Sequence, residues 1–383
     1  MSLLSRTYSP IGLHFGSLET RILQLRGGPG HWRVGTHAVC PARGKNRHAL
    51  AVEKIAQKTR NLRLNGKDTA VSMSGDAGTV SLVPVDAHNR SRLNQLLAET
   101  ARRSIADDEG VSYQCLPLLT ATLDSGPLRE EYLLLSVGQS ELRRTKEAVQ
   151  TIGLRPIGLE MDAFATARAL QIGRKNKESA WGFVHIGFGH SFFGVVSDGE
   201  IGFLKPLHLD GQRLLQTLNR ALDRVDEPVD GVPGMLDILA ASGDNDSRPS
   251  DSRDDDEEGG DDEDGAPSFG SVAGLATLKE AAVGHAVEIL HALRLEAEAL
   301  AQEVRACIRH FANRHKGASV ASLMLTGFGV SLPEVEKAVS TALGIPSGLA
   351  TPFTDLDIKA PESVLKEQHL WCAPLGLALR GYE

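Results

Sequence analysis

The chain opens on short apolar runs separated by glycine turns. Ile11–Phe15 is apolar, Gly16 and Ser17 follow as a turn, and Thr20–Leu25 alternates polar with apolar residues. Alternation with a period of two is typical of a half-buried strand. A third short run lies near Trp32–Val39. The pattern therefore predicts a strand meander at the start of the first domain.

A different pattern begins at residue 83. Arg90–Ser104 carries its leucines at helical spacing, and Glu141–Ile152 is also predicted to be a helix. Between them, 113–118 is a strand candidate, and Tyr132–Val137 is a continuous apolar run of the kind found in buried strands. The order helix, strand, strand, helix predicts a small α+β subdomain over residues 83–155.

The opening pattern returns after this subdomain. Trp181–Ile186 and Phe192–Val196 are predicted strands joined by the turn Gly187–His190. Asp198-Gly199 favours a tight hairpin into a third strand over Ile201–Leu209. Because strand, glycine turn and strand recur in this way, we expect two similar α/β lobes that face each other.

Composition adds one unusual segment. Residues 251–264 hold ten acidic residues and one Arg, a net charge of −9, so the rest of the chain is close to neutral at +1. This balance leaves no basic surface of the kind that binds nucleic acid. The acidic, Gly- and Ser-rich stretch 227–274 cannot bury enough apolar surface to offset its ordering entropy, so we expect disorder there.

The division that follows has five parts. They are a first lobe (1–82), the inserted subdomain (83–155), a second lobe (156–226), the acidic insert (227–274), and the remainder of the second lobe with a closing helix (275–383). The four cysteines form no metal or disulfide spacing. No signal peptide and no apolar run of about 18 residues is apparent, so we expect a cytoplasmic protein.

Three glycine turns carry the candidate chemistry. They are Gly16-Ser17, Gly187–Gly189 and Gly327–Gly329, the last of which follows the predicted strand Leu323–Thr326. Backbone N–H groups at such turns can point at phosphate oxygens, and glycine permits close approach. One turn alone is a weak signal, but one turn in each lobe and a third before a helix is the arrangement that a nucleotide cleft between two lobes requires.

The segments around these turns resemble the PilM-type proteins of type IV pilus assembly. That family belongs to the actin-like ATPase superfamily and is related to FtsA. The resemblance is carried by IGLHFGSLETRILQL, GLRPIGLEMDAFATARAL, WGFVHIGFGHSFFGVVSDGEIGFLKPLHLDGQRL, MLTGFGVSLPEVEKAVSTALGIP and APLGLALRGYE. It extends over nearly the whole chain except the acidic insert, and its order and spacing are more specific than any single motif.

The resemblance implies a fold, a site and a partner. The fold would be actin-like (ribonuclease H-like), with two lobes and an inserted subdomain of the 1C type. The cofactor site would use Gly16, Ser17, Arg21, Gly187, Gly189, Gly327 and Gly329. The partner would be the cytoplasmic N-terminal tail of an inner-membrane pilus or secretion protein, which would hold this chain at the membrane; self-association stays open.

This sequence departs from the family pattern at the residues that would bind metal and nucleotide. His14 and His185 stand where the family has carboxylates that organise Mg²⁺, and Arg21 replaces a phosphate-reaching Lys. Mg²⁺ prefers oxygen ligands, which an imidazole does not supply. Phe328 replaces the middle glycine of the third turn, where it would crowd adenine and be strained by a positive φ. We therefore expect lost hydrolysis, weak or absent ATP binding, no metal site and no catalytic residue.

Several alternatives stay open on the sequence. His14 and His185 fit buried, hydrogen-bonded imidazoles, cationic contacts to phosphate, or a transition-metal pair that lacks a third ligand. Arg21 fits a phosphate contact or an exposed strand-end residue. Glu160 and Asp162 imitate an acid/base pair, although an N-cap role for Asp162 is the simpler interpretation. At the level of function, the alternative to a scaffold is an active ATPase whose lobes close on nucleotide.

Overall fold

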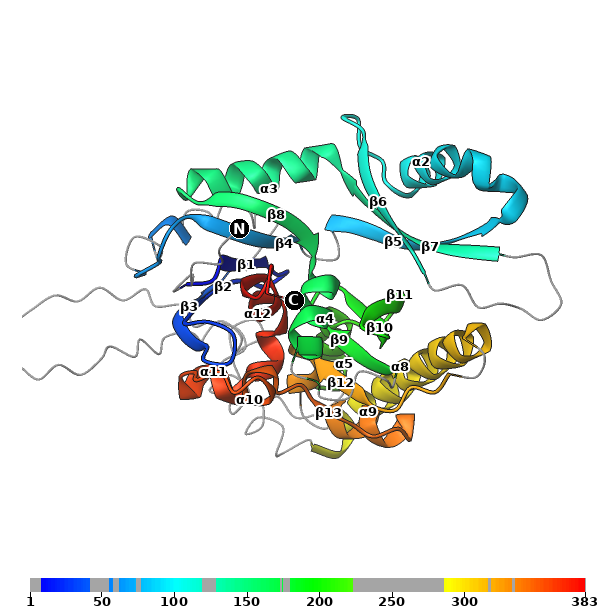
Figure 1. The fold of residues 1–383 in the computed structure, drawn as a ribbon. Helices are drawn as coiled ribbons and strands as arrows, with labels where there is room; N and C mark the ends of the chain where they lie inside the picture. Colours follow the sequence, from blue (N-terminus) through cyan, green and yellow to red (C-terminus); the bar gives the residue numbers. More distant parts are fainter. Residues whose placement is uncertain are drawn as a thin grey trace, which may run out of the picture.

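Three β-sheets form the framework of the protein in the computed structural model (Figure 1). The structure describes residues 8–41, 55–57, 62–73, 77–118, 129–172, 174, 180–222, 286–315, 318–332 and 335–382. The first sheet has the order β3-β2-β1-β4-β8, formed by β1 (Ile11–Phe15), β2 (Glu19–Arg26), β3 (Arg33–Pro41), β4 (Asp68–Met73) and β8 (Arg155–Met161). The second has the order β11-β10-β9-β12-β13, formed by β9 (Trp181–Ile186), β10 (Ser191–Ser197), β11 (Glu200–Leu207), β12 (Leu323–Thr326) and β13 (Ser347–Leu349). The third has the order β5-β7-β6, formed by β5 (Gly78–Asp86), β6 (Val111–Pro117) and β7 (Arg129–Gly138).

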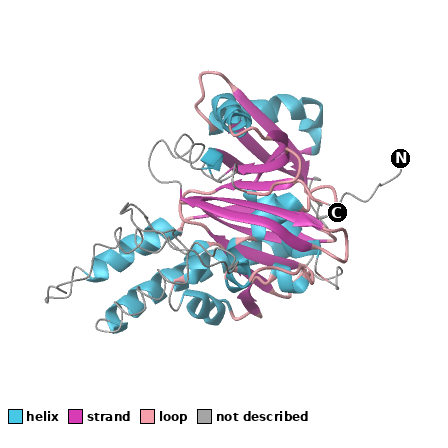
Figure 2. Ribbon diagram, turned by 90° about the vertical axis from the view of Figure 1, so that its left-hand side faces the viewer, coloured by secondary structure: helices cyan, strands magenta, loops and turns pink. Residues whose placement is uncertain are grey.

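Helices lie between and outside these sheets, as the view turned by 90° also shows (Figure 2). The α-helices are α2 (Leu93–Ser104), α3 (Gln139–Thr151), α4 (Asp162–Ile172), α5 (Gly211–Leu222), α8 (Ala286–Arg314), α9 (Val335–Leu343), α10 (Pro352–Asp355), α11 (Glu362–Lys366) and α12 (Cys372–Ala378). Short 3-10 helices are η2 (Ala87–Arg92), η3 (Phe328–Ser331) and η4 (Gln368–Leu370). In the parts of the chain that the structure describes, no helix combines the length and the apolar character that crossing a membrane requires.

The two five-stranded sheets have the same architecture. In each, three consecutive strands form an antiparallel meander, and the first strand of the meander then pairs in parallel with a later strand. The predicted repetition of the opening pattern is therefore present in the sheet topology. The Asp198-Gly199 hairpin turn is present as well, with φ of 54° and 85° at its two residues. Positive φ at both positions is what a type I′ turn needs.

Helices α4 and α12 pack together between the two lobes. Helix α12 contacts β1, β2 and β4 of the first sheet, while α4 contacts β8 of the first sheet and β10 of the second. Their approach is so close that a Cβ on Gly376 would lie 1.7 Å from the carbonyl oxygen of Ala165. A Cβ on Gly12 of β1 would likewise lie 2.2 Å from the carbonyl oxygen of Pro374. Gly376 therefore permits the close packing of α12 on α4, and Gly12 permits the close packing of α12 on the first sheet.

The three-stranded sheet contributes to two cores. Helix α2 covers one face, where Leu97 and Leu134 are fully buried. Leu133, the next residue along β7, belongs instead to the cluster that contains Phe183 of the second lobe. Strand β5 begins at Gly78, so the predicted boundary between 82 and 83 falls inside a strand. Sequence analysis missed its first half although Thr79-Val80-Ser81-Leu82 alternates polar and apolar residues as a half-buried strand does; the other boundaries stay predictions.

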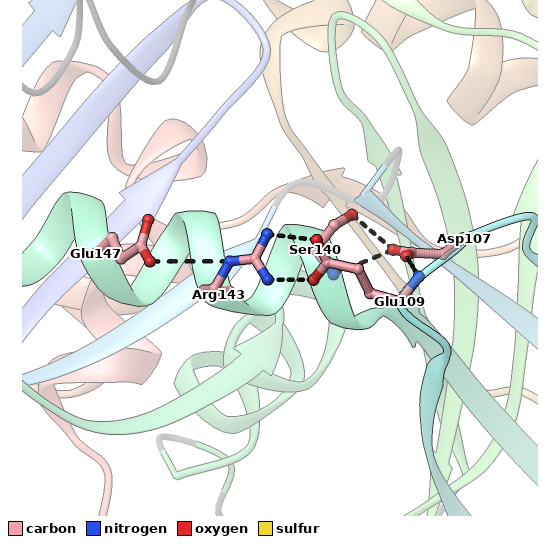
Figure 3. A network of polar contacts seen from close by, with 5 residues as sticks. All are labelled: Asp107, Glu109, Ser140, Arg143 and Glu147. Atoms are coloured by element: carbon pink, nitrogen blue, oxygen red, sulfur yellow. Dashed lines mark hydrogen bonds and ion pairs between the residues drawn. The ribbon is translucent and has the colours of Figure 1, made fainter.

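A polar network fixes the start of α3 (Figure 3). Asp107 accepts hydrogen bonds at Oδ2 from the backbone N–H and the hydroxyl of Ser140, at 3.1 and 2.6 Å, and at Oδ1 from the N–H of Glu109, at 2.9 Å. Glu109 in turn pairs with Arg143 on α3, whose guanidinium lies 3.8 Å from Glu147. The carboxylate of Asp107 thus satisfies one of the N–H groups that the first turn of a helix leaves unpaired.

Candidate functional site

Two imidazoles occupy equivalent places in the two lobes. His14 is the penultimate residue of β1, and its Nδ1 lies 2.7 Å from the hydroxyl of Ser72 on the parallel neighbour β4. His185 is the penultimate residue of β9, and its Nδ1 lies 3.0 Å from the hydroxyl of Thr326 on the parallel neighbour β12. Each pair is also in direct register across its two strands. The sequence-predicted positions are therefore equivalent in three dimensions.

The glycine turns close against these imidazoles. A Cβ on Gly16 would lie 2.8 Å from the carbonyl oxygen of Glu19 and 3.3 Å from Nε2 of His14. A Cβ on Gly187 would lie 2.4 Å from the carbonyl oxygen of His190 and 3.0 Å from Nε2 of His185. Both turns thus exclude any side chain at the glycine, and the Nε2 atom of each imidazole faces its turn.

The three predicted turns come together. A Cβ on Gly189 would lie 2.8 Å from the hydroxyl oxygen of Ser17, so the turns of the two lobes face each other at close range. Gly327 has φ of 89°, and a Cβ there would lie 2.6 Å from the carbonyl oxygen of Ile186. A Cβ on Gly329 would lie 2.2 Å from Cγ2 of the same isoleucine. The chain thus builds one cluster of loops from segments far apart in sequence.

Burial keeps both imidazoles neutral. Desolvation lowers the pKa of His14 to about 4 and the pKa of His185 to about 3, and the neighbouring Asp162 offsets this only in part. The ring of His185 also stacks on Phe192, with centroids 4.7 Å apart and an angle of 10° between the planes. Neutral, hydrogen-bonded imidazoles at pH 7 agree with the buried alternative and argue against cationic contacts to phosphate.

A third group lies beside these imidazoles. Asp162 is the first residue of α4, and its side chain is 1% exposed. Its Oδ2 lies 2.6 Å from Nε2 of His190, which precedes β10. Burial is the largest single influence and alone would raise the pKa of Asp162, but the neighbouring His190, with smaller effects of His185 and His14, lowers it by more, so the carboxylate is ionised. The ligand atoms of Asp162, His185 and His190 all lie within 4.8 Å of one another.

Comparisons with known proteins find one matching family model and solved structures with a similar fold. The family model described as type IV pilus assembly protein PilM matches residues 287–382. The solved PilM–PilN type IV pilus biogenesis complex aligns over 98% of this chain and 99% of that chain, with 16% identity and a TM-score of 0.69. The predicted resemblance to PilM is confirmed.

A second solved structure aligns over almost the same length. The ethanolamine utilization protein EutJ from Carboxydothermus hydrogenoformans matches over 98% of this chain and 90% of that chain, with 14% identity and a TM-score of 0.50. No curated protein sequence matches the chain. Identities this low establish the fold alone, and the fold of this PilM-like chain is actin-like, as predicted.

Arg21 differs from one of its two predicted placements, and its contact with phosphate stays a prediction. Its side chain is 4% exposed, so it is not an exposed strand-end residue. The guanidinium lies 2.5 Å from Oε1 of Glu19, 4.0 Å from Glu367, and 4.7 Å from the ring centroid of Trp371. Burial raises the pKa of Glu367 to about 7, against the influence of Arg21. The positive charge expected to contact phosphate is therefore already engaged inside the PilM-like fold.

The structure also corrects the expected strain at Phe328 and the expected capping role of Asp162. Gly327 takes the positive φ, so Phe328 is not strained; its ring packs edge-on against Phe188, with centroids 5.8 Å apart. The hydroxyl of Ser331, next to this turn, lies 2.6 Å from Nε2 of His369. Asp162 was expected to cap α4 by its side chain. Asp162 is itself the first residue of α4, and its carboxylate contacts His190 instead.

The acid/base alternative is not supported at Glu160. Its carboxylate accepts hydrogen bonds from the guanidinium of Arg168 at 2.6 and 3.0 Å and from Arg380 at 3.1 Å. Sequence analysis missed His190, although it ends a turn already singled out for its glycines. The available signal was a polar residue directly before a buried strand. The group whose ligand atoms lie together is Asp162, His185 and His190, and not the His14–His185 pair considered from the sequence.

Proposed function

We propose that this PilM-like chain is a scaffold component of a type IV pilus or type II secretion-like assembly. It would bind the cytoplasmic tail of an inner-membrane partner and be held at the membrane by that partner. The observation that carries the proposal is the alignment of nearly the entire chain with the PilM–PilN complex, supported by the family match over residues 287–382.

The cleft supports a scaffold over a nucleotide hydrolase. His14 and His185 are neutral imidazoles at the two places where the resemblance implies carboxylates. Arg21 is engaged by Glu19, and Ser17 closely approaches Gly189 of the opposite turn. Hard Mg²⁺ gains few oxygen ligands from such a site. We infer that Mg-dependent hydrolysis is lost and that ATP binds weakly or not at all.

The partner would dock at the edge of the first sheet. Strand β8 is the last strand of that sheet, and its register with β4 shifts so that Thr69 pairs with Pro156 and Ala70 with Gly158. Ile157 lies between these pairs as a bulged residue and is 44% exposed. A bulge re-aims a side chain, and a sheet edge is a common docking place for an extended peptide. The junction of the first lobe with the inserted subdomain is therefore the proposed peptide site.

A peptide-binding measurement tests this site. A fluorescent peptide with the N-terminal tail sequence of a PilN-type protein is titrated with the chain, and anisotropy reports the bound fraction. Ile157→Asp is expected to weaken binding at least tenfold, which corresponds to about 1.4 kcal/mol. Leu295→Asp is the matched control, because Leu295 on α8 is also exposed, at 53%. No binding by the wild-type chain, or equal binding by both variants, contradicts the proposal.

The alternative is an active ATPase whose lobes close on nucleotide. The approach of the three glycine turns is the observation that favours it, because such turns can cradle phosphate. A fluorescent ATP analogue titrated with and without Mg²⁺ distinguishes the two functions. Sub-millimolar, Mg-dependent binding with phosphate release would establish the ATPase, while its absence agrees with the scaffold.

A further inference from the structure

Three side chains that peptide capture does not use lie together where α4 meets the second lobe. Asp162 begins α4, His185 lies on β9, and His190 lies in the loop that leads to β10. Their ligand atoms all lie within 4.8 Å of one another. We propose that these three residues bind a divalent transition-metal ion such as Zn²⁺, an inference that does not rest on the proposed function.

Hydrogen bonding orients His185 so that its Nε2 atom is available as a metal ligand. The hydroxyl of Thr326 donates to the carbonyl oxygen of Val184, at 3.4 Å, and so leaves its lone pairs for the Nδ1–H of His185, at 3.0 Å. This assignment places the proton on Nδ1 and the lone pair on Nε2. Metal-binding imidazoles typically donate their other N–H in this way, which fixes both tautomer and ring orientation. The stacked ring of Phe192 further restricts the imidazole.

The carboxylate of Asp162 supplies the observation that points to a ligand. The side chain is 1% exposed, and its Oδ1 has no hydrogen-bond partner among the described residues. A buried carboxylate oxygen without a partner is costly, and such groups are uncommon in native proteins. The single hydrogen bond from His190 satisfies only Oδ2. A cation held between this carboxylate and the imidazoles would compensate the remaining negative charge.

The donor set selects the class of metal. Two imidazole nitrogens and one carboxylate oxygen suit Zn²⁺ and the neighbouring first-row transition metals. Mg²⁺ and Ca²⁺ prefer oxygen ligands and would bind poorly here. His185 and His190 each keep part of their surface exposed, so water can fill a fourth position. Three protein ligands with one open position is an arrangement that Zn²⁺ adopts.

Metal binding requires one local rearrangement. Nε2 of His190 and Oδ2 of Asp162 now share a hydrogen bond of 2.6 Å. Tetrahedral ligands about 2.0–2.2 Å from Zn²⁺ lie roughly 3.3 Å apart, so this pair must separate by a fraction of an ångström. The shared proton moves to Nδ1 of His190 or leaves to solvent, after which both atoms offer lone pairs. The metal would then join α4 to the second lobe.

The experiment measures Zn²⁺ binding by the full chain. The protein is freed of metal with a chelator, returned to buffer with excess Mg²⁺ to occupy the acidic run 251–264, and titrated with Zn²⁺ by calorimetry. We expect one high-affinity Zn²⁺ per chain, and a visible absorption spectrum typical of tetrahedral coordination when Co²⁺ replaces Zn²⁺. Thr326→Val removes the orienting hydroxyl and is expected to weaken binding 10–100-fold.

The ligand variants decide the proposal. His190→Gln and Asp162→Asn should each lose at least 100-fold in Zn²⁺ affinity, while His208→Gln, which changes an exposed imidazole paired with Glu303, should bind like wild type. Asp162 is buried and its variant can fail to fold, so the partly exposed His190 decides, with circular dichroism of the metal-free proteins as the folding check. The proposal is overturned if the wild-type chain does not bind Zn²⁺ stoichiometrically, or if His190→Gln binds Zn²⁺ as tightly as wild type.

Discussion

Lowering the pH should decrease the stability of the folded protein, because folding disfavours protonation of His14. The ring is partly buried and hydrogen-bonded to Ser72, and desolvation lowers its pKa from 6.5 to about 4. In the unfolded chain the same ring takes up a proton near its ordinary pKa. Since the unfolded state binds the proton first, the folded state loses stability as pH falls through the window from about 6.5 to 4.

The size of this effect follows from the two pKa values. Between pH 7 and pH 5 the contribution of His14 to the free energy of unfolding falls by about 2 kcal/mol, and its limit below pH 4 is about 3.4 kcal/mol. Glu367 acts in the opposite direction, because burial raises its pKa to about 7 and protonation on acidification relieves that penalty. The total pH profile therefore mixes several groups, and a variant is needed to isolate one of them.

His14→Gln supplies that comparison. Glutamine can still hydrogen-bond to Ser72 but does not titrate, so the difference between the two proteins isolates the imidazole. Urea unfolding of both proteins, with chelator and at constant ionic strength, gives the free energy of unfolding at pH 7, 6 and 5. We expect wild type to lose about 2 kcal/mol more than the variant between pH 7 and 5. Parallel profiles, or an NMR titration that places the pKa of His14 at 6.5 or above, would refute the reasoning.

Three other changes test the packing, the buried charge and the polar network. Gly376→Ala should destabilise the protein by about 1–3 kcal/mol or more in thermal unfolding, because its Cβ would meet the carbonyl oxygen of Ala165; Gly28→Ala, with nothing within 4 Å, should change little. Arg21→Gln should cost about 3–5 kcal/mol in urea unfolding, since it strands a buried carboxylate, and unchanged stability would contradict the buried pairing. Asp107→Ala should speed hydrogen exchange in the first turn of α3 and lower the melting temperature, and unchanged exchange would show that water replaces the carboxylate.

The arrangement of two lobes could be predicted because local sequence patterns indicate it. Each meander has a strand period of two, and each tight turn needs a residue that tolerates positive φ, as Asp198 and Gly199 do. Such signals depend on residues that are close in the chain and do not depend on tertiary contacts. Strand β5 was missed over its first half, although its polar and apolar residues alternate there; four residues of alternation form a short signal, and they are only partly buried.

Local sequence patterns could not predict which side chains pair with the charged groups. Arg21 was expected at a phosphate or in solvent, and it is buried against Glu19 and Trp371, the latter 350 positions later in the chain. Asp162 fits an N-cap by position, yet its hydrogen bond goes to His190 across the lobe boundary. No short-range pattern records which side chains two distant segments will bring together.

The sequence by itself determined the repeated lobe, the three glycine turns and the placement of His14 and His185 at equivalent strand ends. These features follow from backbone conformation, hydrophobic period and residue identity, all of which are local. Only the tertiary structure decided that the imidazoles are neutral, that Arg21 is already engaged, and that Asp162 and His190 join His185. The reason is physical: pKa values, ion pairs and ligand sets depend on burial and on distances between atoms from different lobes.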